Sequence, residues 1–306
     1  MHLIKRLIPI AGISLVILIL ATQVQAFTVF EASRFPEGIN LENIFTYTPL
    51  QYAIVTNVFT LGFAAQAAGL IYFVATLRKV SPPYRLASVL SAVVMVSAFL
   101  ELLRMEQNWQ NAFVFTDGFW RLGTEVFFNG FRYINWSIDV PLLLLQLVIV
   151  LGLTQNRAIS YSSQLIIGGL LMIWTGYIGQ FYEVTNLALF AFWGIVSTLF
   201  YMYILLVVWE LISTTVGNLP SNLQGMMRNI RWYILITWSF YPIAYVLPVF
   251  WSTEWTIVTR QIIFSFADIT TKVIYGAILT YIARQRSQAD NYQEAIATVH
   301  IRSSLS

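Results

Sequence analysis

Seven long apolar stretches, separated by short polar links, dominate the pattern of hydrophobic and polar positions along this chain of 306 residues. A helix needs about 20 mainly apolar residues to cross a bilayer, and each stretch meets that length. The predicted membrane-spanning helices are residues 49–78, 84–106, 127–153, 161–182, 186–213, 226–250 and 257–283. The predicted fold class is therefore an all-α membrane protein, built as a bundle of seven transmembrane helices.

The two ends of the chain differ from this central region. Residues 1–26 have Lys5 and Arg6, then an apolar run, then a Val-Gln-Ala end, which is the layout of a cleaved secretory signal peptide. A retained extra helix is the alternative. Residues 27–48 are then an extracellular N-terminal segment, residues 49–285 the seven-helix domain, and residues 286–306 a polar cytoplasmic tail.

The links carry turn signals and an uneven distribution of basic residues. Two prolines in KVSPPYR are expected to stop the first helix, and the long link NWQNAFVFTDGFWRLGTEVF predicts a small hairpin. One side of the seven spans carries Arg78, Lys79, Arg85, Arg157, Arg228, Arg231, Arg284 and Arg286, and the other side chiefly Arg34, Arg104 and Arg121. Because basic loops are retained in the cytoplasm, the N-terminus is predicted to be extracellular and the C-terminus cytoplasmic.

Composition narrows the class of protein and excludes several kinds of site. Hydrophobic residues make up 58% of the chain and charged residues 10%, with a mean hydropathy of +0.70, whereas soluble domains are about 25% charged. The absence of cysteine excludes disulfides and thiolate metal sites, and two histidines are too few for a buried histidine-ligated metal. The net charge of +3 is explained by cytoplasmic basic residues, so nucleic acid is not an expected partner, whereas membrane lipid is.

A stripe of polar residues lies within the third apolar stretch, in RYINWSIDVPLLLLQ. Its members are Arg132, Asn135, Asp139 and Gln146. Their spacings of three, four and seven residues put them on one face of a helix. Interhelical hydrogen bonding is the alternative for the two amides, but a buried arginine or aspartate costs about 3 kcal/mol at the centre of a membrane helix. The stripe therefore predicts an internal path for ions.

The seventh stretch places a lysine at the centre of the bilayer. Lys272 is twelve residues from Arg260 and twelve from Arg284, which is about 18 Å from either end of the helix. Asp268 lies four residues earlier, on the same face. A lysine at this depth must be ion-paired, neutral or covalently modified, and lysine amines form Schiff bases with carbonyl compounds. A purely structural ion pair with Asp268 is the alternative.

Taken together, these residues resemble those of the microbial (type 1) rhodopsins, which are bacteriorhodopsin-like bundles. The shared motifs are Asp-x-x-x-Lys in the last helix and Arg-Tyr-x-x-Trp, followed by a proline, in the third. The similarity covers nearly all of residues 49–285 and includes LSAVVMVSAFL, TGYIGQFYEV and SFYPIAYVLP. It implies all-trans retinal held by Lys272 as a protonated Schiff base, in a transporter rather than an enzyme.

Three positions in the third helix sort the ion pumps of this family. Here they are Asn135, Asp139 and Gln146, and this set resembles that of the light-driven sodium pumps. Outward proton pumps of the family typically have a carboxylate at the first position. The resemblance also implies a homopentamer, with no obligate protein partner, in the plasma membrane of a bacterium.

The resemblance further implies roles for other residues. Those expected to surround retinal are Trp136, Met172, Gly176, Trp193, Ser197, Trp238, Tyr241, Pro242 and Thr271. Those expected at the extracellular and cytoplasmic ends of the ion path are Glu42, Glu183 and Arg260, and Ser91 with Gln146. Ser88 and Thr280 stand where some members have asparagine and glycine. The resemblance therefore does not assign the residues that select the ion at the cytoplasmic end.

A mechanism can be built on these assignments. Sodium cannot pass a protonated Schiff base easily, because two like charges 4 Å apart repel by about 4 kcal/mol at an effective dielectric constant near 20. Asp139 is therefore expected to accept the proton, after which Asn135 and Asp268 bind Na⁺ transiently through hard oxygen atoms. Arg132 is expected to block leakage back from outside. An outward proton pump and a photosensory rhodopsin are the alternatives.

Glu101 is a carboxylate where other members of this group can have leucine. It is expected either to turn inward and share a hydrogen bond or proton with Asp139, or to pair with Arg104 at the membrane interface.

Overall fold

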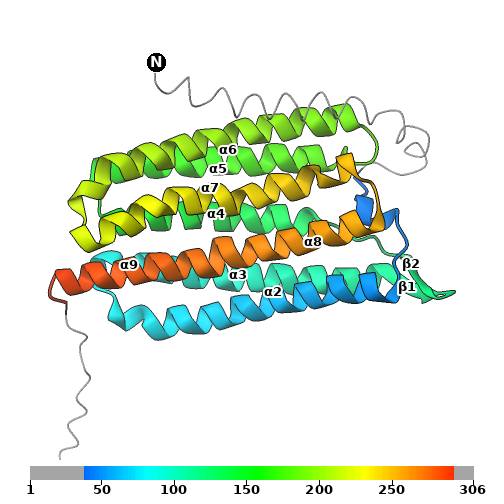
Figure 1. Cartoon of the computed structure of the whole chain (residues 1–306), viewed down its shortest axis with the longest axis horizontal. Helices are drawn as coiled ribbons and strands as arrows, with labels where there is room; N and C mark the ends of the chain where they lie inside the picture. Colours follow the sequence, from blue (N-terminus) through cyan, green and yellow to red (C-terminus); the bar gives the residue numbers. More distant parts are fainter. Residues whose placement is uncertain (1–37, 293–306) are drawn as a thin grey trace, which may run out of the picture.

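The structure, a computed structural model, describes residues 38–292 (Figure 1). The predicted signal peptide at residues 1–26 lies outside the described residues, as do residues 27–37 of the predicted extracellular segment and residues 293–306 of the predicted cytoplasmic tail. Within the described range, seven helices are long and apolar enough to cross a membrane, so the predicted multi-pass, all-α fold is confirmed.

The seven helices run along one common direction, and the last one is interrupted (Figure 1). Their bounds are α2 Pro49–Thr76, α3 Pro82–Ala112, α4 Gly130–Leu151, α5 Gln155–Gln180, α6 Leu187–Thr215, α7 Ser221–Phe250, and α8 Glu254–Asp268 continued by α9 Tyr275–Ala289. Short 3₁₀ turns at Leu41–Asn43, Leu77–Lys79 and Val216–Asn218 complete the helical elements.

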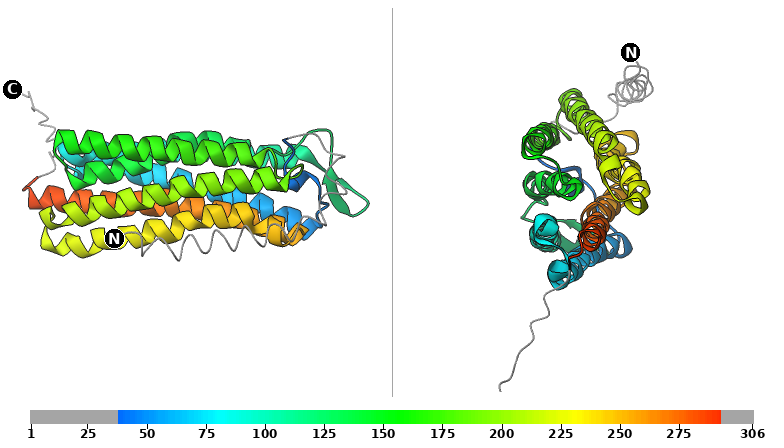
Figure 2. Two further views of the ribbon diagram at one scale, coloured as in Figure 1. Left: turned by 90° about the horizontal axis from the view of Figure 1, so that it is seen from above. Right: turned by 90° about the vertical axis from the view of Figure 1, so that its left-hand side faces the viewer.

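Helices that are consecutive in sequence also pack side by side. In addition, α2 packs against α8, so the seven helices close into a ring, and α4 also touches α9 across it. The end-on view of Figure 2 shows α3, α4 and α5 along one side of the bundle, and α6, α7 and the last helix along the other. This arrangement turns α4 and the last helix toward each other, and it brings the two polar stripes together.

The link after α3 forms the expected small hairpin, which extends beyond one end of the bundle (Figure 1). Strands β1 (Phe113–Thr116) and β2 (Phe119–Leu122) are antiparallel. Asp117 and Gly118 connect them with φ angles of 53° and 82°, the backbone of a tight hairpin turn that an Asp-Gly pair favours. We call this the hairpin end of the bundle, and the end where α3 begins and α9 finishes the tail end.

The local structure agrees with the predicted spans and adds detail at two places. The first helical span ends before the prolines of KVSPPYR, since α2 finishes at Thr76, a 3₁₀ turn follows, and Pro82 begins α3, where its missing N–H is not needed. The last span, Glu254–Ala289, covers the predicted residues 257–283 but is not regular α-helix throughout. A π-helical turn at Ile269–Ile274, which we call the π turn, separates α8 from α9 and contains Lys272.

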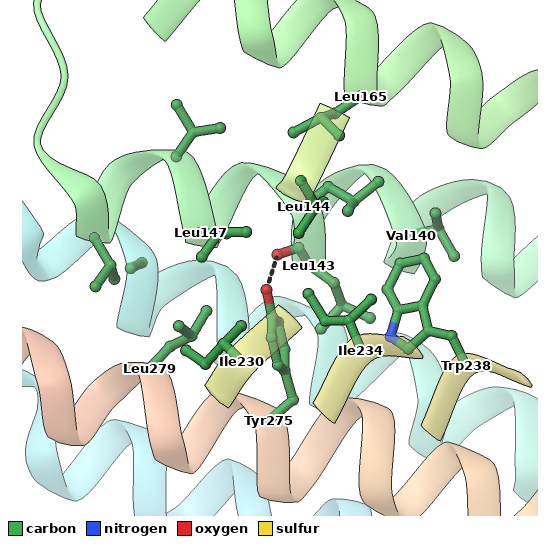
Figure 3. Packing of buried hydrophobic residues seen from close by; sticks show 14 of the residues in the cluster. Val140, Leu143, Leu144, Leu147, Leu165, Ile230, Ile234, Trp238, Tyr275 and Leu279 are labelled. Atoms are coloured by element: carbon green, nitrogen blue, oxygen red, sulfur yellow. Dashed lines mark hydrogen bonds between the residues drawn. The ribbon is translucent and has the colours of Figure 1, made fainter. Parts of the chain in front are cut away.

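Apolar side chains close the tail-end half of the bundle. Figure 3 shows Leu143, Leu144 and Leu147 of α4 facing Ile230 and Ile234 of α7 and Leu279 of α9. Tyr275 lies between these layers, and its hydroxyl donates to the Leu143 carbonyl at 3.2 Å. Since these residues belong to one buried cluster, any ion that reaches the centre from the tail end has to displace part of this packing or pass along its polar edge.

Candidate functional site

Three oxygen atoms surround the Lys272 nitrogen at the centre of the bundle. Nζ donates to Asn135 Oδ1 at 2.9 Å and lies 3.0 Å from Asp139 Oδ2 and 2.9 Å from Asp268 Oδ1. All four side chains are buried. The two stripes inferred from the sequence therefore meet at one point, where two carboxylates and one amide oxygen compensate a single ammonium group.

Asn135 and Asp139 differ in how they are held. The Asn135 amide donates to Ser97 Oγ on α3 at 2.6 Å, which leaves its oxygen directed at Lys272. Asp139 makes the ion pair with Lys272, but among residues 38–292 neither of its oxygens has a hydrogen bond of good geometry. Within the described residues, Asp139 is thus held beside the lysine by the ion pair rather than by hydrogen bonds.

Arg132 lies on the hairpin side of this centre and shares a carboxylate with it. Its Nη1 donates to Asp268 Oδ2 at 3.2 Å, and its Nη2 donates to Gln261 Oε1 at 2.8 Å. The guanidinium carbon also lies 4.9 Å from the centre of the Phe264 ring. Asp268 therefore bridges two cations, Lys272 and Arg132, and fixes their separation.

Glu101 turns inward, but its contact differs from both expectations. It is buried, so the expected interfacial pair with Arg104 is wrong. Its Oε1 lies 3.5 Å from Arg132 Nη1, and neither of its oxygens has a hydrogen-bond partner in the described part of the chain, so the shared hydrogen bond with Asp139 is absent there. Glu101 is thus a third buried carboxylate close to the lysine centre, and it contacts that centre through Arg132. It lies on α3, one helical turn nearer the hairpin end than Ser97.

A second buried cluster lies at the hairpin end. Arg260 donates to both oxygens of Glu42, at 3.1 and 2.6 Å, and its other terminal nitrogen donates to Glu183. Gln261 donates to Glu42 at 2.5 Å and also accepts from Arg132. Gln261 thus joins the hairpin-end cluster to the lysine centre, a role that the sequence patterns did not predict.

Charge compensation sets the ionisation of this hairpin-end cluster. Burial alone would raise the pKa of the Glu42 carboxyl, but the nearby Arg260 guanidinium and the hydrogen bonds from Arg260 and Asn129 hold that pKa below its ordinary value. Glu42 is therefore ionised and tied to Arg260 at neutral pH.

On the tail-end side, the structure brings together the residues expected there. Ser91 donates to Gln146 Oε1 at 3.0 Å, and the Ser88 and Thr280 hydroxyls are 3.4 Å apart. All four side chains are buried. They form the polar edge of the apolar packing between the lysine centre and the tail end.

A cavity of about 510 Å³ opens beside Lys272, within the range of small-molecule sites. Of the residues expected around retinal, those that line it are Trp136, Met172, Gly176, Ser197, Trp238, Tyr241, Pro242 and Thr271, with Lys272 itself. Trp193 is not among them. Its Cβ lies against Gly179 of α5 instead, and its neighbour Gly194 contributes to the lining.

The cavity suits a long apolar aldehyde. Its lining is mainly aromatic and aliphatic, and the lysine amine that would form the covalent bond belongs to it. The indole nitrogens of Trp136 and Trp238, both buried, have no hydrogen-bond partner within residues 38–292. These two indoles therefore contribute only apolar ring surface to the cavity, and the apolar lining with the lysine amine in it fits the polyene aldehyde retinal.

Sequence reasoning missed several buried polar residues. Gln261 could have been found, because it lies seven residues before Asp268 and so on the same helical face. Asn129, three residues before Arg132, carried a similar signal. Ser97 and Gln66 carried none, since each is a single polar residue in an apolar stretch.

Comparison with known proteins gives consistent matches. Residues 53–286 match the family described as "Bacteriorhodopsin-like protein". The chain is 25% identical over 244 residues to a green-light absorbing proteorhodopsin from a gamma-proteobacterium, covering 79% of this chain and 88% of that protein. It is 27% identical over 238 residues to bacteriorhodopsin-I of Haloquadratum walsbyi, covering 72% and 83%.

Two solved structures are also similar. A thermophilic rhodopsin has a TM-score of 0.76 and 31% identity, with 81% of this chain and 99% of that chain covered. Xanthorhodopsin, described as a light-driven ion pump with dual chromophore, has a TM-score of 0.74 and 31% identity over the same shares.

The hairpin-end cluster predicts a pH dependence of stability. Because the folded pKa of Glu42 is lowered, its ion pair with Arg260 stabilises the fold fully above the unfolded value near 4.5 and is lost as the pH falls through the folded pKa. The Glu42→Gln variant is expected to have a free energy of unfolding about 3 kcal/mol lower than the wild type at pH 7. Below pH 4.5 its stability should depend less on pH than that of the wild type. Thermal unfolding in detergent from pH 3 to 7 measures this. Glu125→Gln, an exposed carboxylate at the same end, serves as the control and should behave as the wild type does.

Proposed function

This chain belongs to the bacteriorhodopsin-like family, the microbial (type 1) rhodopsins, and we propose that it is a light-driven pump that exports sodium ions. Members of this family of light-driven ion pumps bind retinal through a Schiff base. For this chain, the lysine in question is Lys272, which lines the cavity of suitable size. When bound there, retinal supplies the absorption of visible light and a change of shape beside the lysine nitrogen.

Asp139 is the proton acceptor in this proposal. It lies 3.0 Å from the Lys272 nitrogen and has no competing hydrogen bond of good geometry in the described residues. Transfer of the proton to Asp139 removes one positive charge and one negative charge from the path. The repulsion between the lysine nitrogen and a cation 4 Å away, about 4 kcal/mol at an effective dielectric constant near 20, is then removed together with the attraction of Asp139, and Asp268 remains as the charged ligand for the cation.

Asn135 carries the choice of sodium over protons. Its amide oxygen occupies a position 2.9 Å from Lys272 Nζ, where a carboxylate could take a proton, but an amide cannot. With Asp268 Oδ1, also 2.9 Å from Nζ, it presents two hard oxygen atoms to a cation once the lysine nitrogen is neutral. Gln146 likewise cannot donate a proton from the tail-end side, which disfavours a proton relay.

The direction of transport depends on the orientation inferred from the loop charges. Sodium is taken up at the cytoplasmic tail end past Ser91 and Gln146, and it leaves at the hairpin end past Arg132 and the Glu42–Arg260–Glu183 cluster. Arg132, held by Asp268 and Gln261, keeps a positive charge on the exit side and opposes return of the ion. We further propose, from the family resemblance, a homopentamer in a bacterial plasma membrane.

Outward proton pumping is the second candidate. Glu101 favours it, because it provides another buried carboxylate within reach of Arg132. A pump that carries protons when sodium is absent would combine both activities.

Retinal attachment is tested by Lys272→Ala. The variant should fold but remain colourless after all-trans retinal is added, because the chain has no other lysine at this depth. Lys79→Ala, which removes the lysine at the tail end, should form pigment as the wild type does. Visible, hydroxylamine-sensitive pigment in Lys272→Ala would remove the assignment.

Ion selection is tested at Asp139 and Asn135. Asp139→Asn should abolish sodium transport and slow deprotonation of the lysine nitrogen, since no carboxylate then lies in the acceptor position. Asn135→Asp should shift transport toward protons, because it adds an acceptor 2.9 Å from the lysine. Light-driven transport in vesicles, with sodium and proton fluxes recorded separately, measures both. Sodium pumping that survives Asp139→Asn would contradict the proposal.

The role of Glu101 is tested by Glu101→Leu. Removal of a carboxylate 3.5 Å from Arg132 should move the midpoint of the acid-induced colour change and alter the rate of lysine deprotonation, while retinal still binds. Glu106→Leu, a half-buried carboxylate five residues further along α3 that accepts a hydrogen bond from Thr60, is the control. If both variants match the wild type in colour titration and photocycle, Glu101 has no part in the charge balance.

A further inference from the structure

The backbone carbonyls that lead into the π turn receive an unusual number of side-chain donors. Thr270 donates to the carbonyls of Phe266 and Ala267, both at 3.0 Å, and Thr271 donates to Ala267 at 2.7 Å. A change from i→i+4 to i→i+5 pairing breaks the regular ladder and leaves carbonyls short of donors. The threonine hydroxyls therefore satisfy carbonyls within the same helix.

Two further donors come from other helices. Gln66 of α2 donates through Nε2 to the Asp268 carbonyl at 3.3 Å, and Tyr233 of α7 donates to the Thr270 carbonyl at 2.6 Å. At the other side of the turn, Tyr275 donates to the Leu143 carbonyl of α4 at 3.2 Å (Figure 3). Three neighbouring helices thus hold the six-residue turn that carries Lys272.

Ordinary packing does not account for Gln66. The side chain is completely buried, and its Oε1 has no hydrogen-bond partner among residues 38–292. A half-satisfied buried amide costs more than an apolar side chain of the same size. The bond to the Asp268 carbonyl is the contribution of this glutamine that a methionine could not make.

We propose that Gln66, Tyr233 and Tyr275 are positioning residues that form a brace on the π turn and fix the direction of Lys272. The turn decides where the lysine points, because one residue added to or removed from an α-helix rotates the remainder of the helix by about 100°. With the brace in place, Lys272 Nζ meets Asn135, Asp139 and Asp268 together. Without it, the turn can exchange with regular α-helix, and the lysine loses this set of partners.

The brace acts before light and before any ion binds. The inference rests on the proposed role of Lys272 as the retinal attachment site, but it does not depend on which ion is pumped. The proposal also distinguishes Tyr241 from Tyr233 and Tyr275. Tyr241 contacts the carboxylate of Asp268 directly at 2.8 Å, whereas Tyr233 and Tyr275 act only through the backbone.

The first test uses the full-length protein without retinal. Hydrogen exchange of the amides from 269 to 275 is compared in wild type, Tyr233→Phe and Gln66→Met, with thermal unfolding recorded alongside. Loss of one interhelical hydrogen bond should speed local exchange by up to about tenfold. Tyr203→Phe is the matched control, because its hydroxyl bonds Gln164 on α5, far from the lysine in sequence and structure. Unchanged exchange in both test variants overturns the brace, whatever the pump transports.

The second test adds all-trans retinal. Tyr233→Phe and Gln66→Met should shift the absorption maximum and slow pigment formation, and the double variant should be less than additive because both bonds hold one turn. A variant that only lowers the unfolding temperature, with wild-type absorption and pigment formation, has a structural role alone and contradicts the proposal. Should the wild type form no pigment, retinal attachment fails, while the exchange measurement still decides the brace.

Discussion

The ammonium group of Lys272, placed at the centre of an apolar bundle, is the constraint on which the rest of the structure depends. A charge at this depth is tolerated only if it is compensated and hydrogen-bonded. Asp139, Asp268 and Asn135 provide that compensation from two helices. Because Asp268 also binds Arg132, the charge balance extends toward the hairpin end and reaches Glu42 through Gln261. A single buried lysine thus accounts for one continuous set of buried polar contacts.

The same set of contacts suggests how one site both holds and moves charge. Asp268 is tied by Lys272, Arg132 and Tyr241, so it cannot easily leave its position. Asp139 is bound to the lysine alone among the charged groups that contact it. A fixed carboxylate beside a loosely held one gives the site a permanent cation ligand and a separate proton acceptor. In the proposed mechanism, the Asn135 amide favours sodium over protons because an amide oxygen can bind a cation but cannot take up a proton.

Much of this could be predicted from the sequence, because the signals were periodic. The seven spans are predicted by apolar length, and spacings of four residues put Asn135 with Asp139, and Asp268 with Lys272, on one face of their helices; the resemblance to the rhodopsins implied that these faces meet. The π turn at Ile269–Ile274 was missed, since an i→i+5 pairing leaves no mark on a short polar pattern. The inward contact of Glu101 with Arg132 was also missed, because it depends on how α3 packs on α4. Spacing also could not decide which residue of α6 lines the cavity: Gly194 does, whereas its neighbour Trp193, expected around retinal from the resemblance, does not contribute to the lining.

The proposal that this protein moves sodium depends on a proton that stays within the site, passing from the lysine to Asp139 and back. Light-induced pH change in a suspension of cells or vesicles containing the full-length protein, in sodium salt and in potassium salt with a protonophore present, tests it most directly. Export of sodium draws protons inward passively, so the external pH should rise on illumination in sodium salt, and the rise should persist with the protonophore and disappear in potassium salt. External acidification in sodium salt that the protonophore abolishes would contradict the account.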